Sequence, residues 1–176
     1  MSALRVVDIV EGTSVDGPGL RTSIYLAGCA HRCPGCHNPS TWSFEAGRDM
    51  SVAEILDIVE RNGYNVTLTG GDPLYSAQAL IPLVAELRGR GYNIWCYTGF
   101  TFEELIAGGE SLPAGTLALL EALDVLVDGP FVESLRDTSL MFRGSSNQRI
   151  LDLPASLRAK SPVLHRLNSG PSLPEF

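Results

Sequence analysis

Basic residues and long apolar runs are scarce in this sequence of 176 residues. Lys and Arg number 13 against 20 Asp and Glu, which gives a formal net charge of −7. A nucleic-acid-binding domain normally carries a basic patch, so we expect no nucleic-acid partner. No segment approaches the ~20 apolar residues that cross a bilayer, and the N-terminus lacks the pattern of a secretion signal. We therefore expect no membrane partner and a cytoplasmic location.

Paired cysteines are also lacking. The chain has four cysteines, and because we expect a reducing compartment, they argue against a disulfide framework. Three of them, Cys29, Cys33 and Cys36, are crowded on one short segment, which indicates metal or redox chemistry. The fourth, Cys96, falls in an expected strand and is best explained as a small buried hydrophobic residue.

Short apolar runs alternate with helical patterns through most of the chain. The expected strands are Arg5–Val10, Thr22–Ala27, Asn65–Thr69, Asn93–Tyr97, Asp124–Asp128 and Gln148–Leu151. The expected helices are Val52–Arg61, Ala77–Arg88, Phe102–Ala107 and Thr116–Ala122. This order predicts right-handed crossovers and a mainly parallel sheet. Strands such as Asn93–Tyr97 and Asp124–Asp128 are apolar on both faces, as a parallel sheet covered on both sides requires.

The fold class expected from this order is α/β. The chain is shorter than the ~250 residues of a full eight-stranded barrel, so we expect an open, partial parallel β/α barrel of about six strands. Residues 1–153 would form this domain. Residues 154–176 would form a C-terminal tail with a short helix followed by extended or disordered chain.

Glycines follow four of the expected strands. The four segments are Gly28-Cys29, Gly70-Gly71-Asp72-Pro73, Thr98-Gly99 and Gly129-Pro130. In a parallel sheet the carboxyl ends of the strands meet at one rim, where α/β sites assemble. We therefore expect these four loops to converge on one functional site.

The cysteine loop, Cys29–His37, is compatible with several kinds of site. Its three thiolates could bind three irons of a cubane 4Fe–4S cluster and leave the fourth iron open. Zinc would need the three cysteines plus His31 or His37, although structural zinc loops usually supply two separated cysteine pairs. A haem attachment site normally implies export, and a redox dithiol normally opens a helix, which Asn38-Pro39 would break. The loop alone favours iron–sulfur over zinc only modestly.

Motifs around these loops resemble the radical S-adenosylmethionine superfamily. The pattern is C-x3-C-x2-C after one strand and Gly-Gly-acid-Pro after another. Flanking segments resemble the activating enzymes of glycyl-radical enzymes and, more narrowly, the activating proteins of anaerobic ribonucleoside-triphosphate reductases. These segments are Asp16–Arg21, Asn38–Trp42, Thr69–Leu74, Tyr97–Gly99, Val127–Gly129 and Phe142–Gln148.

The resemblance implies roles for the cysteine loop. Cys29, Cys33 and Cys36 would hold the 4Fe–4S cluster, and the open iron would bind the amino and carboxylate groups of S-adenosylmethionine. Gly35, Cys36 and His37 would contact the adenine side of this cofactor. Gly35 stands where superfamily members often carry an aromatic residue, so any side-chain packing on the adenine would come from elsewhere, with His37 as one candidate.

Further roles follow for the other loops. Gly70 and Gly71 would meet the methionine ammonium of the cofactor, because their backbone can approach closely and their carbonyls can accept hydrogen bonds. Asp72 would be a charge partner for that ammonium. Arg21 has two possible roles: it would bind the cofactor carboxylate, or it would pair with Asp16 inside the protein. The polar run 143–149 would line either the cofactor site or a partner surface.

The activity implied is that of a radical S-adenosylmethionine oxidoreductase. It would cleave the cofactor reductively to a 5′-deoxyadenosyl radical and create a glycyl radical on a large partner, the catalytic subunit of anaerobic ribonucleotide reductase. The electron would come from a flavodoxin-like donor. Two alternatives remain: an activase of another glycyl-radical enzyme such as pyruvate formate-lyase, and a non-catalytic zinc or iron–sulfur module.

Overall fold

The structure is a computed structural model that describes residues 3–169. The strands are β1 (Leu4–Thr13), β2 (Arg21–Leu26), β3 (Arg48–Met50), β4 (Asn65–Gly70), β5 (Ile94–Tyr97), β6 (Val125–Asp128) and β7 (Arg149–Asp152). The α-helices are α1 (Val52–Asn62), α2 (Ala77–Gly89), α3 (Phe102–Ala107), α4 (Thr116–Leu120) and α5 (Leu153–Ala159). Short 3₁₀ helices are η1 (Pro39–Thr41), η2 (Pro73–Ser76), η3 (Glu133–Leu135) and η4 (Arg166–Ser169). All six expected strands and all four expected helices are present.

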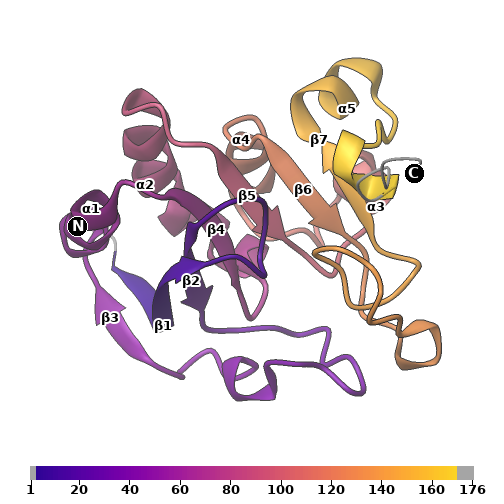
Figure 1. Cartoon of the computed structure of the whole chain (residues 1–176), viewed down its shortest axis with the longest axis horizontal. Coiled ribbons are helices and arrows are strands. Elements are labelled where there is room, and N and C mark those ends of the chain that lie inside the picture. The colour runs from indigo at the N-terminus through magenta and orange to yellow at the C-terminus, as the bar shows by residue number, and fades with distance from the viewer. Residues whose placement is uncertain (1–2, 170–176) are drawn as a thin grey trace, which may run out of the picture.

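The strands form an open, seven-stranded mixed sheet in the order β3-β1-β2-β4-β5-β6-β7 (Figure 1). Neighbouring strands are parallel from β2 through β4 and β5 to β6. The two edges are antiparallel, since β1 pairs with β2 and β3, and β7 pairs with β6. The expectation of a mainly parallel sheet of six strands is therefore correct at the centre and wrong at the edges.

The connections explain the antiparallel edges. Residues 14–20 join β1 to β2, which is fewer than the dozen or more residues of a parallel crossover. The connection from β6 to β7 contains η3 but no α-helix. Strand β3 was not expected from its sequence, because it has only three residues, of which Arg48 and Asp49 are exposed.

Local capping signals define the first helix. The Ser51 side chain accepts a hydrogen bond from the Glu54 amide, and the Glu54 carboxylate accepts one from the Ser51 amide. This reciprocal capping box fixes the start of α1. Gly63 ends the helix in the left-handed conformation, with φ at 65°.

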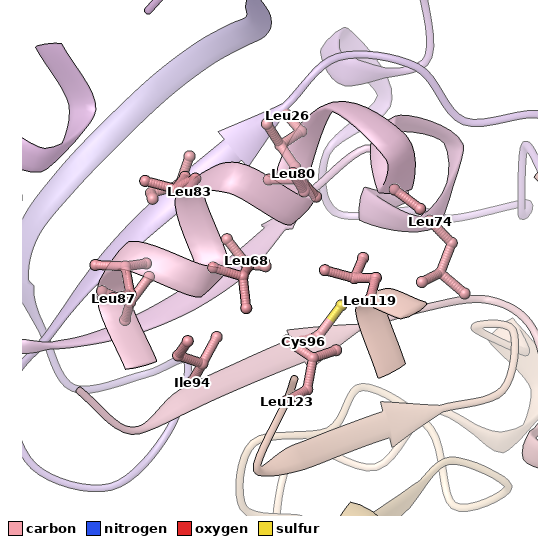
Figure 2. Close-up of a cluster of buried hydrophobic side chains, with 14 of the residues drawn as sticks. Leu26, Leu68, Leu74, Leu80, Leu83, Leu87, Ile94, Cys96, Leu119 and Leu123 are labelled. Atoms are coloured by element: carbon pink, nitrogen blue, oxygen red, sulfur yellow. The ribbon is translucent and has the colours of Figure 1, made fainter. Parts of the chain in front are cut away.

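The helices bury an apolar face of the sheet. Figure 2 shows Leu68 and Cys96 from neighbouring strands packed among leucines of α2 and α4, with no polar atom but the Cys96 sulfur among the labelled side chains. Cys96 is 0% exposed, and burial raises the pKa of its thiol. The expectation that Cys96 is a small buried hydrophobic residue is confirmed.

The opposite face of the central strands is also buried, with polar side chains on β2 and β4 and apolar ones on β5 and β6, where Trp95, Val125 and Val127 cluster with Ile150. Ser23 of β2 and Thr67 of β4 are fully buried on this face. The segment that precedes β2 covers them: the Asp16 carboxylate accepts hydrogen bonds from the Ser23 and Tyr25 hydroxyls, and the Asp16 carbonyl accepts one from Thr67. In β6, by contrast, all four residues are buried and three are apolar, as expected.

Arg21 lies at the amino end of β2 and serves this polar face. Its guanidinium donates to the Thr67 hydroxyl, the Val66 carbonyl and Asn93, and it lies 5.4 Å from the centre of the Trp95 ring. Burial lowers the pKa of Arg21 to about 10. Arg21 is 1% exposed, and within the described residues its hydrogen bonds go to Thr67, Val66 and Asn93 and not to the Asp16 side chain, so Arg21 joins β2 to β4 inside the protein.

The C-terminal segment packs against the sheet as far as Ser169. The expected short helix is present as α5, and beyond it Leu164 forms a β-bridge with Leu151. The Asn168 side chain accepts a hydrogen bond from the Ile150 amide, and the His165 ring contacts Trp95 edge-on. Residues 170–176 of the expected tail lie outside the described residues, and the boundary at residue 153 stays a prediction. Within the described chain, no helix combines the length and apolar character needed to cross a membrane.

Candidate functional site

A cavity of about 400 Å³ lies at the carboxyl ends of the parallel strands. Each of the four glycine-bearing loops contributes to its wall. The contributed residues include Cys29, Cys33, Cys36, Gly70, Gly71, Asp72, Thr98, Gly99 and Gly129. Figure 1 shows the connection from β2 to β3 and the connection from β6 to β7 on the same side of the sheet. The expected convergence of these loops is thus observed.

The three cysteines of the loop are free thiols, and each is half-buried at the cavity wall. Burial, followed by the nearby Asp72 charge, raises the pKa of Cys29. The loop turns tightly between the cysteines: the Cys36 amide donates to the Cys33 carbonyl, and Gly35 takes a φ of +75°. The Asn38 amide donates to the Cys36 sulfur at 3.4 Å.

This donor set suits an iron–sulfur cluster better than a single metal ion. Among residues 3–169, no three His, Cys, Asp or Glu side chains are arranged to hold one ion. A cubane cluster makes a different demand, because each thiolate binds a separate iron atom. Of the two histidines that zinc could use, His31 already bonds to Asp72 through Nε2, and the exposed His37 ring lies against Phe131. Three soft thiolates on one loop therefore fit a cluster with one open iron.

The two glycines after β4 let this loop pack directly on the cysteine loop. A Cβ on Gly71 would lie 2.3 Å from the Gly28 carbonyl oxygen, and one on Gly70 would lie 2.4 Å from the Leu26 nitrogen. The Gly71 amide donates to the Leu26 carbonyl, and the Asp72 amide donates to the Gly28 carbonyl, both at 2.8 Å. Glycine at these positions thus allows close backbone contact between two loops, in addition to exposing both residues to the cavity.

Asp72 belongs to the wall of the cavity, and its carboxylate is withdrawn from solvent. Its side chain is 2% exposed. One carboxylate oxygen accepts from the Leu74 amide. The other accepts from the Thr98 hydroxyl and the Gly99 amide, each at 2.9 Å, and lies 2.8 Å from His31 Nε2. The carboxylate therefore bonds to three separate loops.

Apart from the zinc alternative, no role is predicted for His31 from the sequence, and in the structure its side chain packs inside the site. Its ring lies 4.6 Å from Phe100, edge-on, and a Cβ on Gly99 would come within 2.6 Å of it. His31 and Asp72 are 41 residues apart in the chain. No local pattern links two residues at that separation, so only the folded chain could reveal this contact.

Phe131 is a second residue that the sequence did not single out. It lines the cavity from the loop after β6, and its ring centre lies 5.2 Å from that of His37. A Cβ on Gly35 would lie 3.2 Å from the Phe131 ring, and one on Gly144 would lie 2.9 Å from it. Phe131 and the Glu133 carboxylate, whose Oε1 would lie 3.0 Å from that Cβ, therefore share the space beside Gly35 that a side chain at that position would need.

Comparisons with known proteins agree with this site. Residues 15–151 match the family described as a 4Fe-4S single cluster domain. The anaerobic ribonucleoside-triphosphate reductase-activating protein of Escherichia coli K12 is 38% identical over 146 residues, which cover 76% of this chain and 89% of the relative. Its namesakes in Vibrio cholerae and in phage T4 are 38% and 33% identical, with 77% of this chain covered in each case and 90% and 86% of the relatives. The chain belongs to this family of activating proteins.

A solved structure is also similar in part. The crystal structure of QueE from Escherichia coli superposes with a TM-score of 0.48 at 23% identity, and the match covers 56% of this chain and 53% of that one.

In this member of the activating-protein family, the polar run 143–149 forms an internal network beside the cavity. The Gln148 side chain accepts from the Gly144 and Ser145 amides and donates to the Gly129 carbonyl. Arg143 donates to the Gln148 carbonyl and to Asn168. Most of these polar groups therefore bond within the protein, while Arg143, Gly144 and Gln148 also line the cavity.

Arg149 anchors the end of the same run. It bonds to the Asp128 carboxylate and to Glu103, and these bonds, led by the one to Asp128, raise its pKa. Asp128 also accepts from the Phe102 amide at 2.8 Å. Asp128 thus holds the start of α3 and the start of β7 at the rim.

Proposed function

We propose that this chain is a radical S-adenosylmethionine activase for anaerobic ribonucleoside-triphosphate reductase. It would cleave S-adenosylmethionine reductively and place a glycyl radical on the catalytic subunit of the reductase. The observation that carries this proposal is the meeting of three thiols, on one loop, with the glycine loop of the adjacent parallel strand. Relatives that share 33–38% of their residues with the chain bear the name of this activating protein.

The cluster ligands in this proposal are Cys29, Cys33 and Cys36. When bound, the 4Fe–4S cluster supplies one electron to the sulfonium of S-adenosylmethionine and so yields methionine and a 5′-deoxyadenosyl radical. The protein contributes orientation and shielding from water. Gly70 and Gly71 form the wall on which the methionine end of the cofactor would lie, since neither has a side chain that would intrude.

The adenine end would lie along Gly35, Cys36 and His37. Phe131 supports this assignment, because it stands against Gly35 and His37 at the cavity wall. We infer that Phe131 supplies the aromatic surface that Gly35 cannot provide. Aromatic rings are suited to this task because their flat apolar faces stack on a base.

The finer description of the fold belongs to the same proposal. We interpret the open sheet as a partial barrel of the radical S-adenosylmethionine type, with its polar face toward the cofactor. An incomplete barrel would leave one side open to a glycine loop of the partner enzyme. We also propose a cytoplasmic oxidoreductase with a flavodoxin-like electron donor and no nucleic-acid partner.

Electron paramagnetic resonance tests the choice of partner. The anaerobically reconstituted chain, reduced in the presence of S-adenosylmethionine, is mixed with the catalytic subunit of anaerobic ribonucleotide reductase or, in a matched sample, with pyruvate formate-lyase. We expect the doublet signal of a glycyl radical with the reductase subunit alone. A radical on pyruvate formate-lyase only would favour that class of activase, and no radical on either protein would contradict the proposal.

A further inference from the structure

Asp72 links the cysteine loop to two other loops of the cavity. Its amide donates to the Gly28 carbonyl, at the start of the cysteine loop, and its carboxylate bonds to His31 in the same loop. The same carboxylate accepts from Thr98 and Gly99, which follow β5. One buried side chain therefore fixes how the first cysteine stands relative to two neighbouring strand ends.

The His31 ring also has neighbours other than Asp72. Its ring contacts Phe100 edge-on at 4.6 Å and lies 5.8 Å from Tyr75, and only a glycine at position 99 leaves room for it. His31 stands between Cys29 and Cys33 in the chain. A residue held in this way restricts the backbone between two cluster ligands.

The bonding pattern disfavours direct contact of Asp72 with the cofactor. One carboxylate oxygen already has three partners in the protein, and the side chain is 2% exposed. The other oxygen accepts from Leu74, and because the side chain is buried, a ligand ammonium would reach it only if the carboxylate turned outward and gave up bonds that are expensive to leave unmade in the interior. Its existing partners instead belong to the loops that form the cavity.

We propose that Asp72 and His31 are positioning residues that hold the cysteine loop in the arrangement needed to bind and keep the cluster. This inference rests on the proposed function for the identity of the cluster, but it assigns Asp72 a role in the protein scaffold instead of contact with the methionine ammonium. Loss of the bond between His31 and Asp72 should loosen the loop that carries the three cysteines. Affinity for S-adenosylmethionine should change little.

Three substitutions on the same loop separate this role from a general effect on folding. His31→Phe keeps a ring but removes the donor to Asp72, whereas His31→Gln keeps a donor at similar reach. Arg32→Gln is the matched control, since Arg32 is exposed and its side chain has no hydrogen bond among those found in residues 3–169. The full-length chain is compared in its metal-free and reconstituted forms, and Asp72→Asn is added where circular dichroism shows that it folds.

Hydrogen–deuterium exchange of residues 29–38 in the metal-free chain is the first readout. We expect exchange about tenfold faster in His31→Phe, and near the wild-type rate in His31→Gln and Arg32→Gln. In the reconstituted chain, iron loss to a chelator should also be about tenfold faster in His31→Phe, while KM for S-adenosylmethionine stays within about twofold. Asp72→Asn should behave like His31→Phe and should also speed exchange at residues 98–100.

Two results would overturn the inference. The first is wild-type exchange and iron retention in His31→Phe. The second is an Asp72→Asn protein whose loop exchanges and retains iron normally while KM for the cofactor rises about tenfold, as a direct contact would require. Exchange and iron retention do not depend on cofactor cleavage, so they still decide the role of His31 if the wild-type chain proves to have another activity.

Discussion

The two faces of the central strands differ in how they are buried. Along β2, Ile24 and Leu26 point to the helices and belong to the large apolar core. Ser23 and Tyr25, which alternate with them along the strand, point to the opposite face, where the Asp16 carboxylate accepts a hydrogen bond from each. Both faces are largely withdrawn from water, but one is covered by helices and the other by loops that also form the cavity.

The two faces should therefore contribute differently to stability and to function. The helix face gains free energy from apolar area, which depends little on direction. On β2 and β4 the cavity face is instead buried with polar groups that must each find a hydrogen-bond partner, whereas on β5 and β6 this face carries a second, smaller apolar cluster. We infer that changes on the helix face lower stability without altering the site, whereas changes on the cavity side alter specific bonds and the chemistry they support.

The largest expected effect comes from replacing one cysteine on the cavity side of the sheet and comparing it with a replaced cysteine on the helix side. Cys33→Ser on the cavity loop should abolish iron binding and release of 5′-deoxyadenosine, because serine replaces one of three thiolate ligands. Cys96→Ala on the helix face should keep the iron content of the wild-type chain, since Cys96 lies in the apolar core. Iron and sulfide analysis after anaerobic reconstitution checks both variants. Loss of the cluster in Cys96→Ala would contradict the assignment of ligands.

A smaller effect is expected from Leu68→Ala on the helix face of β4. Leu68 is fully buried in the apolar core, so truncation should lower the free energy of unfolding by about 2–5 kcal/mol. Urea unfolding of the metal-free chain measures this loss. The iron content per folded chain should not change, and a selective loss of iron at full stability would break the distinction between the two faces.

The smallest effect is expected from Thr67→Val on the cavity face. The Thr67 hydroxyl accepts from Arg21 and donates to the Asp16 carbonyl, so its removal should cost about 1–3 kcal/mol of unfolding free energy. The matched control is Thr22→Val. The Thr22 hydroxyl is also buried but has no hydrogen-bond partner within the described residues, so its removal should be neutral or stabilising. Equal losses in the two variants, measured by urea unfolding, would contradict this account of the polar face.

Much of the fold could be predicted because local signals agreed with the tertiary structure. The capping box at Ser51 and Glu54 and the glycine at position 63 define α1 in the sequence and in the structure. The antiparallel edges could not be predicted from alternating elements alone. They depend on the shortness of the connection 14–20 and on pairing between β1 and the three-residue strand β3.

The site was predictable where its residues adjoin in the chain. The spacing of Cys29, Cys33 and Cys36 identified them as candidate ligands, and the order of the strands predicted that the glycine loops lie at the same rim, as they do. The contact between His31 and Asp72 was not predictable, because it joins positions 41 residues apart and neither residue belongs to a distinctive local pattern with the other. Phe131 was missed for a similar reason, since its importance follows from the space beside Gly35.

Metal analysis combined with cofactor cleavage tests the central claim most directly. The chain is reconstituted anaerobically with iron and sulfide, reduced, and incubated with S-adenosylmethionine. We predict about four irons per chain and release of 5′-deoxyadenosine, as a cluster held by three cysteines with one open iron requires. Stoichiometric zinc without iron, or a full cluster that leaves S-adenosylmethionine intact, would contradict the account.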